Sequence, residues 1–166
     1  MAIKIRNARP DDAAGIVAFW NPIIEEGKYT VFDQPFAVEA ERAYIESLGP
    51  RDIFLVAEEE STGRIAGFQS MSPFPSVGTA MAHVGSCGTF VDPEFRRQGV
   101  ARQLFGQLFK LAKEKGYDKI FTYVRADNPT ALAVYQGQGF RIVGRAEKQA
   151  KIKGQYIDEI IIEKLL

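Results

Sequence analysis

The stretch "FVDPEFRRQGVARQLF", residues 90–105, decides the fold and raises a problem of charge. A helix is expected to begin after Gly99, because apolar residues then recur at spacings of three and four. A helix N-terminus carries a partial positive charge and N–H groups without internal partners, so acidic or hydroxyl caps are usual there. Arg96, Arg97 and Arg102 have the opposite sign. Arginines at this position make sense when an anion binds between them.

The glycine and alanine within this stretch favour the same interpretation. Gly99 can adopt backbone angles that turn successive amides toward a ligand, and Ala101 leaves space for one to approach. Phosphate or pyrophosphate is the expected guest. The alternative is a basic turn whose arginines face water. The sequence has no G-x-x-x-x-G-K-[ST] motif and no G-x-G-x-x-G after a strand, which argues against a nucleoside triphosphatase or a dinucleotide-binding fold.

Length and composition predict one domain over residues 1–166, since the chain is 46% hydrophobic and too short for two sizeable cores. Lys plus Arg and Asp plus Glu are both 21, so no general field attracts nucleic acid or an anionic membrane. No apolar run approaches the ~20 residues that span a bilayer. The single Cys87 forms no internal disulfide and "MAIKIRNARP" lacks a signal-peptide core, so we expect a cytoplasmic protein.

The rest of the chain predicts a mixed α/β fold. Strands are expected over residues 2–8, 53–59, 64–71, 81–91, 119–126, 139–146 and 155–165. Helices are expected over residues 10–20, 37–48, 100–116 and 128–138. Residues 21–36 indicate an irregular loop or short helix, and residues 72–80 a second loop. Gly85 and Gly88 inside an expected strand are typical of a bulge or of close approach to a ligand.

Two ordered motifs resemble those of a known family. "FVDPEFRRQGVARQLF" resembles the acyl-CoA pyrophosphate loop of the GNAT N-acetyltransferases, with the pattern [QR]-x-x-G-x-[GA] between a strand and a helix. "NPTALAVYQGQGF", residues 128–140, is similar to the second signature, N-x-x-A-x-x-x-Y-x-x-x-G-F. The resemblance covers essentially the whole chain. It implies the GNAT fold, a mostly antiparallel splayed sheet of about seven strands flanked by about four helices.

Two further segments, "FWNPIIEEGKYTVFDQP" and "GQYIDEIIIEKLL", look most like the phosphinothricin-acetyltransferase-type subgroup. That subgroup acetylates small amines and amino-acid analogues. A homodimer is an expectation at the level of the family.

The resemblance implies acetyl-CoA as cosubstrate and no metal. Amides at the loop and helix start would bind its pyrophosphate, with help from the arginine side chains. Backbone groups of Phe90 and Val91 would pair with pantetheine as an added strand does. Asn128 would contact the cofactor arm or only cap its helix, and Ala131 would give clearance or be a plain core residue. The expected cofactor-binding residues are Phe90, Val91, Arg96, Arg97, Gln98, Gly99, Val100, Ala101, Arg102, Asn128, Ala131 and Tyr135.

Three residues are candidates for the chemistry. The Tyr135 hydroxyl would protonate the departing thiolate, since a phenol pKa of ~10 lies near a thiol's ~8.5. The alternative is an aromatic ring packed in the core. His83, the sole histidine, would be a base or relay to the amine, or a structural strand residue. Cys87 would carry an acetyl group or, as a lone strand cysteine usually does, be a small buried hydrophobe.

The usual base is missing. Many relatives have an "H-x-x-E" pattern at the strand before the loop, whereas "HVGS" places Ser86 where they have glutamate. Water, His83, or Glu25 and Glu26 would compensate, or the amine would arrive deprotonated. The amine would attack the thioester directly, with a strand amide near Phe90 stabilising the oxyanion.

The acceptor is expected beside the first loop, whose Trp20, Tyr29, Phe32 and Phe36 suit a small ligand. The expected acceptor-binding residues are Glu25, Phe32, Phe74 and Ser86. The sequence thus predicts an acetyl-CoA-dependent N-acetyltransferase that acts on the primary amine of a small molecule, such as an amino acid or analogue. The alternatives are acetylation of a protein N-terminus or lysine, and a non-catalytic acyl-CoA-binding regulatory module. Ser86 is the best support for the module.

Overall fold

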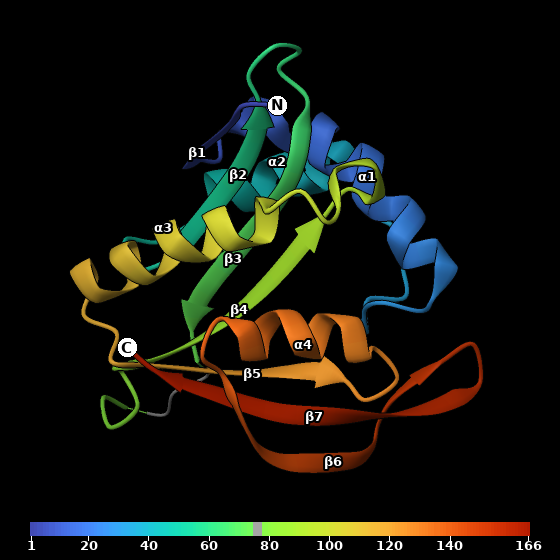
Figure 1. The fold of residues 1–166 in the computed structure, drawn as a ribbon, viewed down its shortest axis with the longest axis vertical. Helices are drawn as coiled ribbons and strands as arrows, with labels where there is room; N and C mark the ends of the chain where they lie inside the picture. The colour runs from blue at the N-terminus through green and yellow to red at the C-terminus, as the bar shows by residue number, and fades with distance from the viewer. Residues whose placement is uncertain (75–77) are drawn as a thin grey trace.

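One sheet organises the fold (Figure 1). The computed structural model describes residues 1–74 and 78–166, and within these the sheet has seven strands in the order β1-β2-β3-β4-β5-β7-β6. Every neighbouring pair is antiparallel except β4 and β5. The strands are β1 Ile3–Asn7, β2 Ile53–Glu59, β3 Ile65–Pro73, β4 Val84–Val91, β5 Lys119–Arg125, β6 Arg141–Ile152 and β7 Gln155–Leu165. The predicted mixed α/β fold with a mostly antiparallel sheet is confirmed.

Helices cover both faces of the sheet. They are α1 Ala13–Glu26, α2 Val38–Glu46, α3 Val100–Glu114 and α4 Pro129–Gly137, with short 3-10 helices η1 Pro10–Asp12 and η2 Pro93–Phe95. In Figure 1, α3 and α4 lie in front of the sheet, and α1 and α2 lie behind it. None of the described helices has the length and apolar character needed to cross a membrane.

The apolar run of β2 follows from these two covered faces. Successive side chains of a strand point to opposite faces. Leu55 belongs to the core on the α3 side, together with Leu104 and Leu108. Phe54 and Val56 belong to the core on the α1 side. A strand buried on both faces therefore has apolar residues at consecutive positions, as "IFLVA" does.

Helix α1 extends further than the sequence suggested. A loop or short helix was expected from Asn21, but α1 continues through Pro22 to Glu26 and ends at Gly27, whose φ is +68°. Ile23 and Ile24 are buried, so they continue the apolar face of the helix past the proline. The expected end at Trp20 was wrong for this reason, and the irregular segment begins at Gly27.

Other boundaries differ less. Strand β4 begins at Val84 rather than at Met81, and β6 continues to Ile152, beyond the expected end at 146. The expected loop over residues 72–80 begins later, because β3 continues to Pro73. Residues 75–77 of that loop lie outside the described part of the chain.

Strands β4 and β5 separate soon after they meet. Their only paired residues are Val84 with Lys119 and Gly85 with Ile120. Beyond this pair, β4 keeps its antiparallel partner β3 and β5 keeps β7. Figure 1 shows the two strands diverging, with α4 beside the opening. The splayed sheet places the candidate site between its two halves.

Candidate active site

The loop before α3 leaves a run of backbone amides without partners. Arg97 has φ +62° and Gly99 has φ +79°, and Gly99 is the N-cap of α3 without a side-chain cap. Among the described residues, the backbone N–H groups of residues 97–102 donate no hydrogen bond. The next N–H group, that of Gln103, donates to the Gly99 carbonyl at 3.1 Å. Unpartnered amides at the positive end of a helix are suited to bind an anion.

Of the arginines in this loop and at the helix start, one contacts other parts of the protein and two face solvent. Arg96 donates to the Val91 carbonyl at 3.3 Å, and its guanidinium carbon lies 5.0 Å from the centre of the Tyr29 ring. Gln98 turns back and donates to the Glu94 carbonyl at 2.9 Å. Arg97 and Arg102 are exposed. The arginines therefore supply positive charge around the amides while Arg96 also holds the loop to β4.

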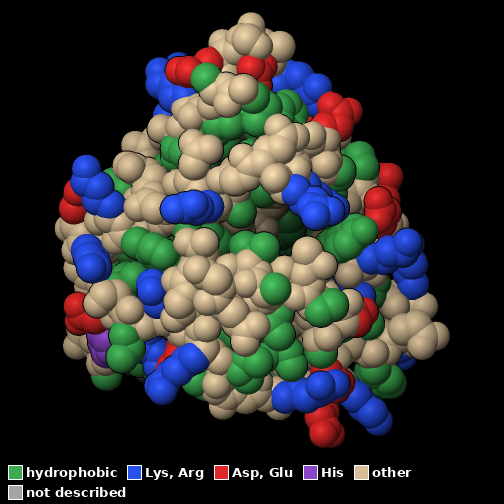
Figure 2. All heavy atoms as spheres, viewed as in Figure 1, with side chains coloured by type: hydrophobic (Ala, Val, Ile, Leu, Met, Phe, Trp, Pro, Cys, Tyr) green, Lys and Arg blue, Asp and Glu red, His purple; other side chains and the backbone are tan. Residues whose placement is uncertain are grey.

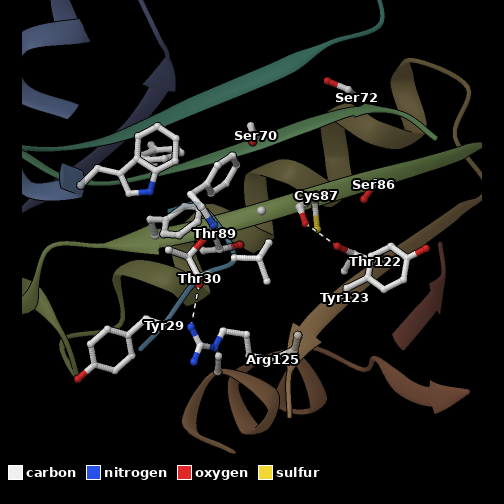
Figure 3. Close-up of a pocket in the computed structure, with 18 of the residues that line it drawn as sticks. Tyr29, Thr30, Ser70, Ser72, Ser86, Cys87, Thr89, Thr122, Tyr123 and Arg125 are labelled. Carbon is white, nitrogen blue, oxygen red and sulfur yellow. Dashed lines mark hydrogen bonds between the residues drawn. The ribbon is translucent and has the colours of Figure 1, made fainter. Parts of the chain in front are cut away.

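Strand β4 has one free edge next to this loop. On one side it pairs with β3, with Phe68 opposite Phe90 and Gly67 opposite Val91. On the other side, none of the described strands pairs with it from Ser86 to Val91. The Thr122 hydroxyl of β5 donates to the Cys87 carbonyl at 2.8 Å and is the bridge seen in Figure 3. An extended ligand can hydrogen-bond to such an edge as an added strand does.

A cavity of about 680 Å³ lies between the two halves of the sheet. Figure 2 shows a hollow near the centre of this face, with hydrophobic side chains inside it and Lys or Arg side chains beside it. Four aromatic residues, Trp20, Phe32, Phe36 and Phe90, form one wall. Trp20 stacks on Phe36 with ring centres 4.6 Å apart and meets Phe32 edge-on at 5.2 Å. The first loop therefore encloses the cavity, as its composition indicated.

Hydroxyl groups line the floor of this cavity. Ser70, Ser72, Ser86 and Thr89 all border it, and Figure 3 shows them along β3 and β4. Ser86 thus brings a hydroxyl rather than a carboxylate to the site.

Tyr135 of α4 also lines the cavity and is only 7% exposed. Its ring meets Phe105 and Phe140 edge-on, with centres 5.3 and 5.1 Å apart. Its hydroxyl donates to the Thr89 hydroxyl at 3.4 Å. Burial raises the pKa of this phenol, and the neighbouring Cys87 adds to the increase. The hydroxyl therefore stays protonated at neutral pH and faces the cavity from a packed ring.

Cys87 is buried, and this burial raises the pKa of its thiol to about 12. A thiol is nucleophilic as its thiolate, which is scarce when the pKa is so high. The small-hydrophobe interpretation of Cys87 therefore fits the structure better than an acetyl carrier.

The second signature contacts the first loop. Asn128 caps α4, since its side-chain oxygen accepts from the Ala131 N–H at 3.1 Å. Its side-chain amide donates to the Tyr29 carbonyl at 3.4 Å. Ala131 lines the cavity. Asn128 and Ala131 thus lie beside the cavity, and Asn128 has a capping role in any case.

Several expected residues lie elsewhere. His83 is exposed in the turn before β4 and does not line the cavity, because the strand begins one residue later. Glu25 and Glu26 are exposed near the end of α1, where their carbonyls accept from Lys153. Phe74 packs edge-on against Phe121, with ring centres 5.2 Å apart, and is not among the lining residues. The structure does not bring these four side chains to the site.

The three charged residues that line the cavity were all missed by the sequence analysis: Glu41, Arg125 and Glu159. Arg125 is 5% exposed and donates to the Gly27 and Thr30 carbonyls at 2.8 and 2.9 Å. It also makes two hydrogen bonds to Asp127, at 2.8 and 2.7 Å. Figure 3 shows the bond from Arg125 to Thr30 beside Tyr29.

A signal for Glu41 was available, because it lies three residues after Val38 and four before Ile45, on the apolar face of α2. No comparable pattern marks Arg125 or Glu159.

The profile of the Acetyltransferase (GNAT) family matches residues 19–140. The chain belongs to this family. A mycothiol acetyltransferase of Kocuria rhizophila is 29% identical over 116 residues, which are 70% of this chain and 37% of that protein. The chain thus spans well under half the length of this curated relative. Membership in this family supports the expected acetyltransferase class.

Solved structures share the fold over nearly the full length. A ribosomal-protein-alanine N-acetyltransferase from Brucella melitensis has a TM-score of 0.90 at 23% identity and covers 98% of this chain and 99% of its own. A phosphinothricin acetyltransferase from Sinorhizobium meliloti, solved in complex with AcCoA, has a TM-score of 0.90 at 19% identity and covers 100% and 89%. These proteins are named for different acceptors, so the phosphinothricin-type subgroup stays a prediction.

The residues of the site fit acetyl-CoA. The unpartnered amides before α3 suit its phosphates, and the free edge of β4 suits its amide-containing arm. Among residues 1–74 and 78–166, no group of three or more His, Cys, Asp or Glu side chains is placed to hold a metal ion.

Proposed function

We propose that the protein transfers the acetyl group of acetyl-CoA to the primary amine of a small molecule, by direct attack of the amine. The observation that carries the proposal is the adjacency of three features. Unpartnered amides at residues 97–102 lie at the end of the free β4 edge, and that edge borders the cavity. Bound acetyl-CoA supplies an acetyl group activated as a thioester.

The loop and β4 would bind the cosubstrate. N–H groups of residues 97–102 would donate to the pyrophosphate, and Arg97 and Arg102 would neutralise part of its charge. Backbone groups of Phe90 and Val91 would hold the pantetheine arm. The arm would then run toward Tyr135, because Thr89 of β4 already accepts a hydrogen bond from that hydroxyl.

Tyr135 would act on the leaving sulfur. Its raised pKa keeps the hydroxyl protonated, so it can donate a hydrogen bond as negative charge develops on sulfur. The same shift moves the pKa of the phenol further above a thiol's ordinary pKa of ~8.5, which favours hydrogen-bond donation over complete proton transfer.

The cavity favours a small acceptor over a protein chain. Its aromatic wall and the first loop enclose it, with Trp20 5% exposed and Phe32 43% exposed at its edge. A protein substrate needs an open groove for the residues that flank its amine. The cavity of about 680 Å³ would hold the thioester end of acetyl-CoA as well as the acceptor, which leaves room for a small compound.

Turnover with a panel of acceptors tests the proposal. The purified protein is mixed with acetyl-CoA, a thiol reagent and either small primary amines or peptides with free N-termini and lysines. We expect thiol release that depends on a small amine, with the acetylated amine identified by mass spectrometry. Release with peptides alone would favour the protein acetyltransferase, and tight acetyl-CoA binding without any release would favour the regulatory module.

A further inference from the structure

Two carboxylates border the cavity without partners. Glu41 of α2 is 4% exposed and Glu159 of β7 is 9% exposed, and both line the cavity. Among the described residues, neither side chain makes a hydrogen bond or an ion pair. The other buried acids of the described chain are held: Asp12 by Arg6, Asp92 by Arg64, Glu59 by Ser61 and Thr62, and Glu163 by Arg141. Glu41 and Glu159 thus depart from the pattern of this protein.

An unpaired buried carboxylate is costly, because the charged form loses hydration without a compensating bond. The pKa of Glu41 is raised by this burial. The pKa of Glu159 is raised by burial too, although the charge of Arg125 opposes the increase. Both groups would gain from a cation that enters the cavity, and a cationic ligand is what they lack.

The single positive side chain among the lining residues is already committed. Arg125 has five N–H donors, and four of them are used by Asp127 and by the Gly27 and Thr30 carbonyls. Its charge is paired with Asp127 at 2.7 Å. An acceptor that carried a carboxylate would therefore meet two like charges and no free cation, which disfavours amino acids.

The two carboxylates enter from opposite flanks. Glu41 lies beside Tyr44, on the helix that packs behind β2 and β3, and Tyr44 itself packs on Phe54 with ring centres 5.9 Å apart. Glu159 lies on β7, directly across from Arg125 of β5. Between the flanks lie the aromatic wall and the serines of β3 and β4. This arrangement suits an apolar body with a cationic group at one end or at both ends.

We propose that the cavity binds a cationic primary amine that has an apolar body and no carboxylate, with Glu41 and Glu159 as its charge partners. The inference rests on the proposed function for the claim that this amine is the acetyl acceptor. It revises the sequence-based expectation of an amino acid. Aralkylamines and alkyl diamines are the two forms of this one chemical class.

Matched pairs of compounds test it with the wild-type protein. Phenethylamine is compared with phenylalanine, and diaminobutane with ornithine, so that the carboxylate is the main difference within each pair. Phenylalaninamide keeps the substituent of phenylalanine but removes its negative charge. We expect kcat/KM for each amine to exceed that for its amino acid by at least about tenfold, which corresponds to ~1.4 kcal/mol. Equal or better turnover of the amino acids would overturn the inference while leaving the acetyltransferase function intact.

Variants show whether the two carboxylates are responsible. Glu41→Gln and Glu159→Gln keep the side-chain shape and remove the charge. Each should raise KM for a diamine, and at least one should raise KM for phenethylamine, while KM for acetyl-CoA stays unchanged. Glu46→Gln is the matched control, because Glu46 is exposed on the same helix as Glu41. Unchanged amine KM in both folded cavity variants would refute the assignment of Glu41 and Glu159.

A binding measurement separates this inference from the function on which it rests. Calorimetry is performed with phenethylamine or diaminobutane and no acetyl-CoA. Amine binding that weakens in the Gln variants supports the charge partners even when no compound is acetylated, in which case the proposed function fails alone. Preferential binding of phenylalanine or ornithine, or no binding of either amine together with no turnover of amines, overturns the inference.

Discussion

Replacing Tyr135 by Phe and by Ala separates chemistry from packing at the centre of the site. The Phe variant keeps the ring between Phe105 and Phe140 and removes only the hydroxyl, whose hydrogen bond to Thr89 is long at 3.4 Å. Loss of a hydrogen bond of ordinary strength costs about 0.5–1.5 kcal/mol, and this long bond belongs at the low end. Stability should therefore change little.

The Ala variant loses the ring as well. Truncation of a buried aromatic residue costs about 3–5 kcal/mol, which includes the two edge-on contacts at about 0.5–1.5 kcal/mol each. Catalysis should show the opposite ranking. If the hydroxyl stabilises the leaving sulfur, kcat should fall by about 10²-fold already in the Phe variant. Each factor of ten in rate corresponds to ~1.36 kcal/mol of activation barrier.

Three assays measure these effects: thiol release for kcat, calorimetry for coenzyme A affinity, and chemical denaturation for the free energy of unfolding. We expect Tyr135→Phe to show low kcat with near-normal affinity and stability, and Tyr135→Ala to be both slow and unstable. A Phe variant with full kcat would remove Tyr135 from the chemistry and leave it a core residue.

Three further predictions follow from other positions. Gly99→Asp should weaken coenzyme A binding by several kcal/mol, as calorimetry would show, because a carboxylate repels the phosphates at short range. Gly99→Asn is the control, since Asn tolerates the positive φ of +79°, and it should lose much less binding free energy. Equal losses in the two variants would contradict a charge effect. Gly67→Ala should lower the free energy of unfolding by about 1–3 kcal/mol, because its new Cβ would lie 2.7 Å from the Phe90 carbonyl oxygen. Gly106→Ala, with open space around it in α3, should instead raise that free energy by about 0.5–1 kcal/mol. Burial raises the folded-state pKa of Glu41, so the contribution of this group to stability is present in acid and is lost as pH rises through that pKa. The melting temperature of Glu41→Gln should therefore exceed that of the wild type at pH 7, and the difference should shrink in acid. A melting temperature below that of the wild type at pH 7 would contradict this sign.

Much of the fold was accessible from local sequence. Strands β2 and β7 have the predicted bounds, since the first is a bounded apolar run and the second a β-rich segment after a turn. The end of α1 was not predicted, because Asn21 and Pro22 are typical of a break. The burial of Ile23 and Ile24 outweighs the hydrogen bond that the proline cannot donate.

The site divides in the same way. The amides without partners before α3 belong to consecutive residues, so "RRQGVA" was enough to predict where they lie. Burial of Glu41 and Arg125 depends on contacts between segments far apart in the chain, such as the bond from Arg125 to Thr30. His83 was wrongly expected at the site because β4 begins a few residues later than predicted. Its side chain is therefore exposed and not in the sheet.

The hydrogen bonds of Arg125 attach residues 27–30 of the first loop to the half of the sheet that contains β5. Its guanidinium joins β5 to the Gly27 and Thr30 carbonyls, and Asn128 at the start of α4 joins the Tyr29 carbonyl. Hydrogen bonds to a charged group contribute about 1.5–3 kcal/mol each. Residues 27–30 therefore cannot swing away from the cavity independently of β5 and α4. A displacement of β5 and α4 would carry residues 27–30 with them, so this part of the cavity wall would move with the second half of the sheet.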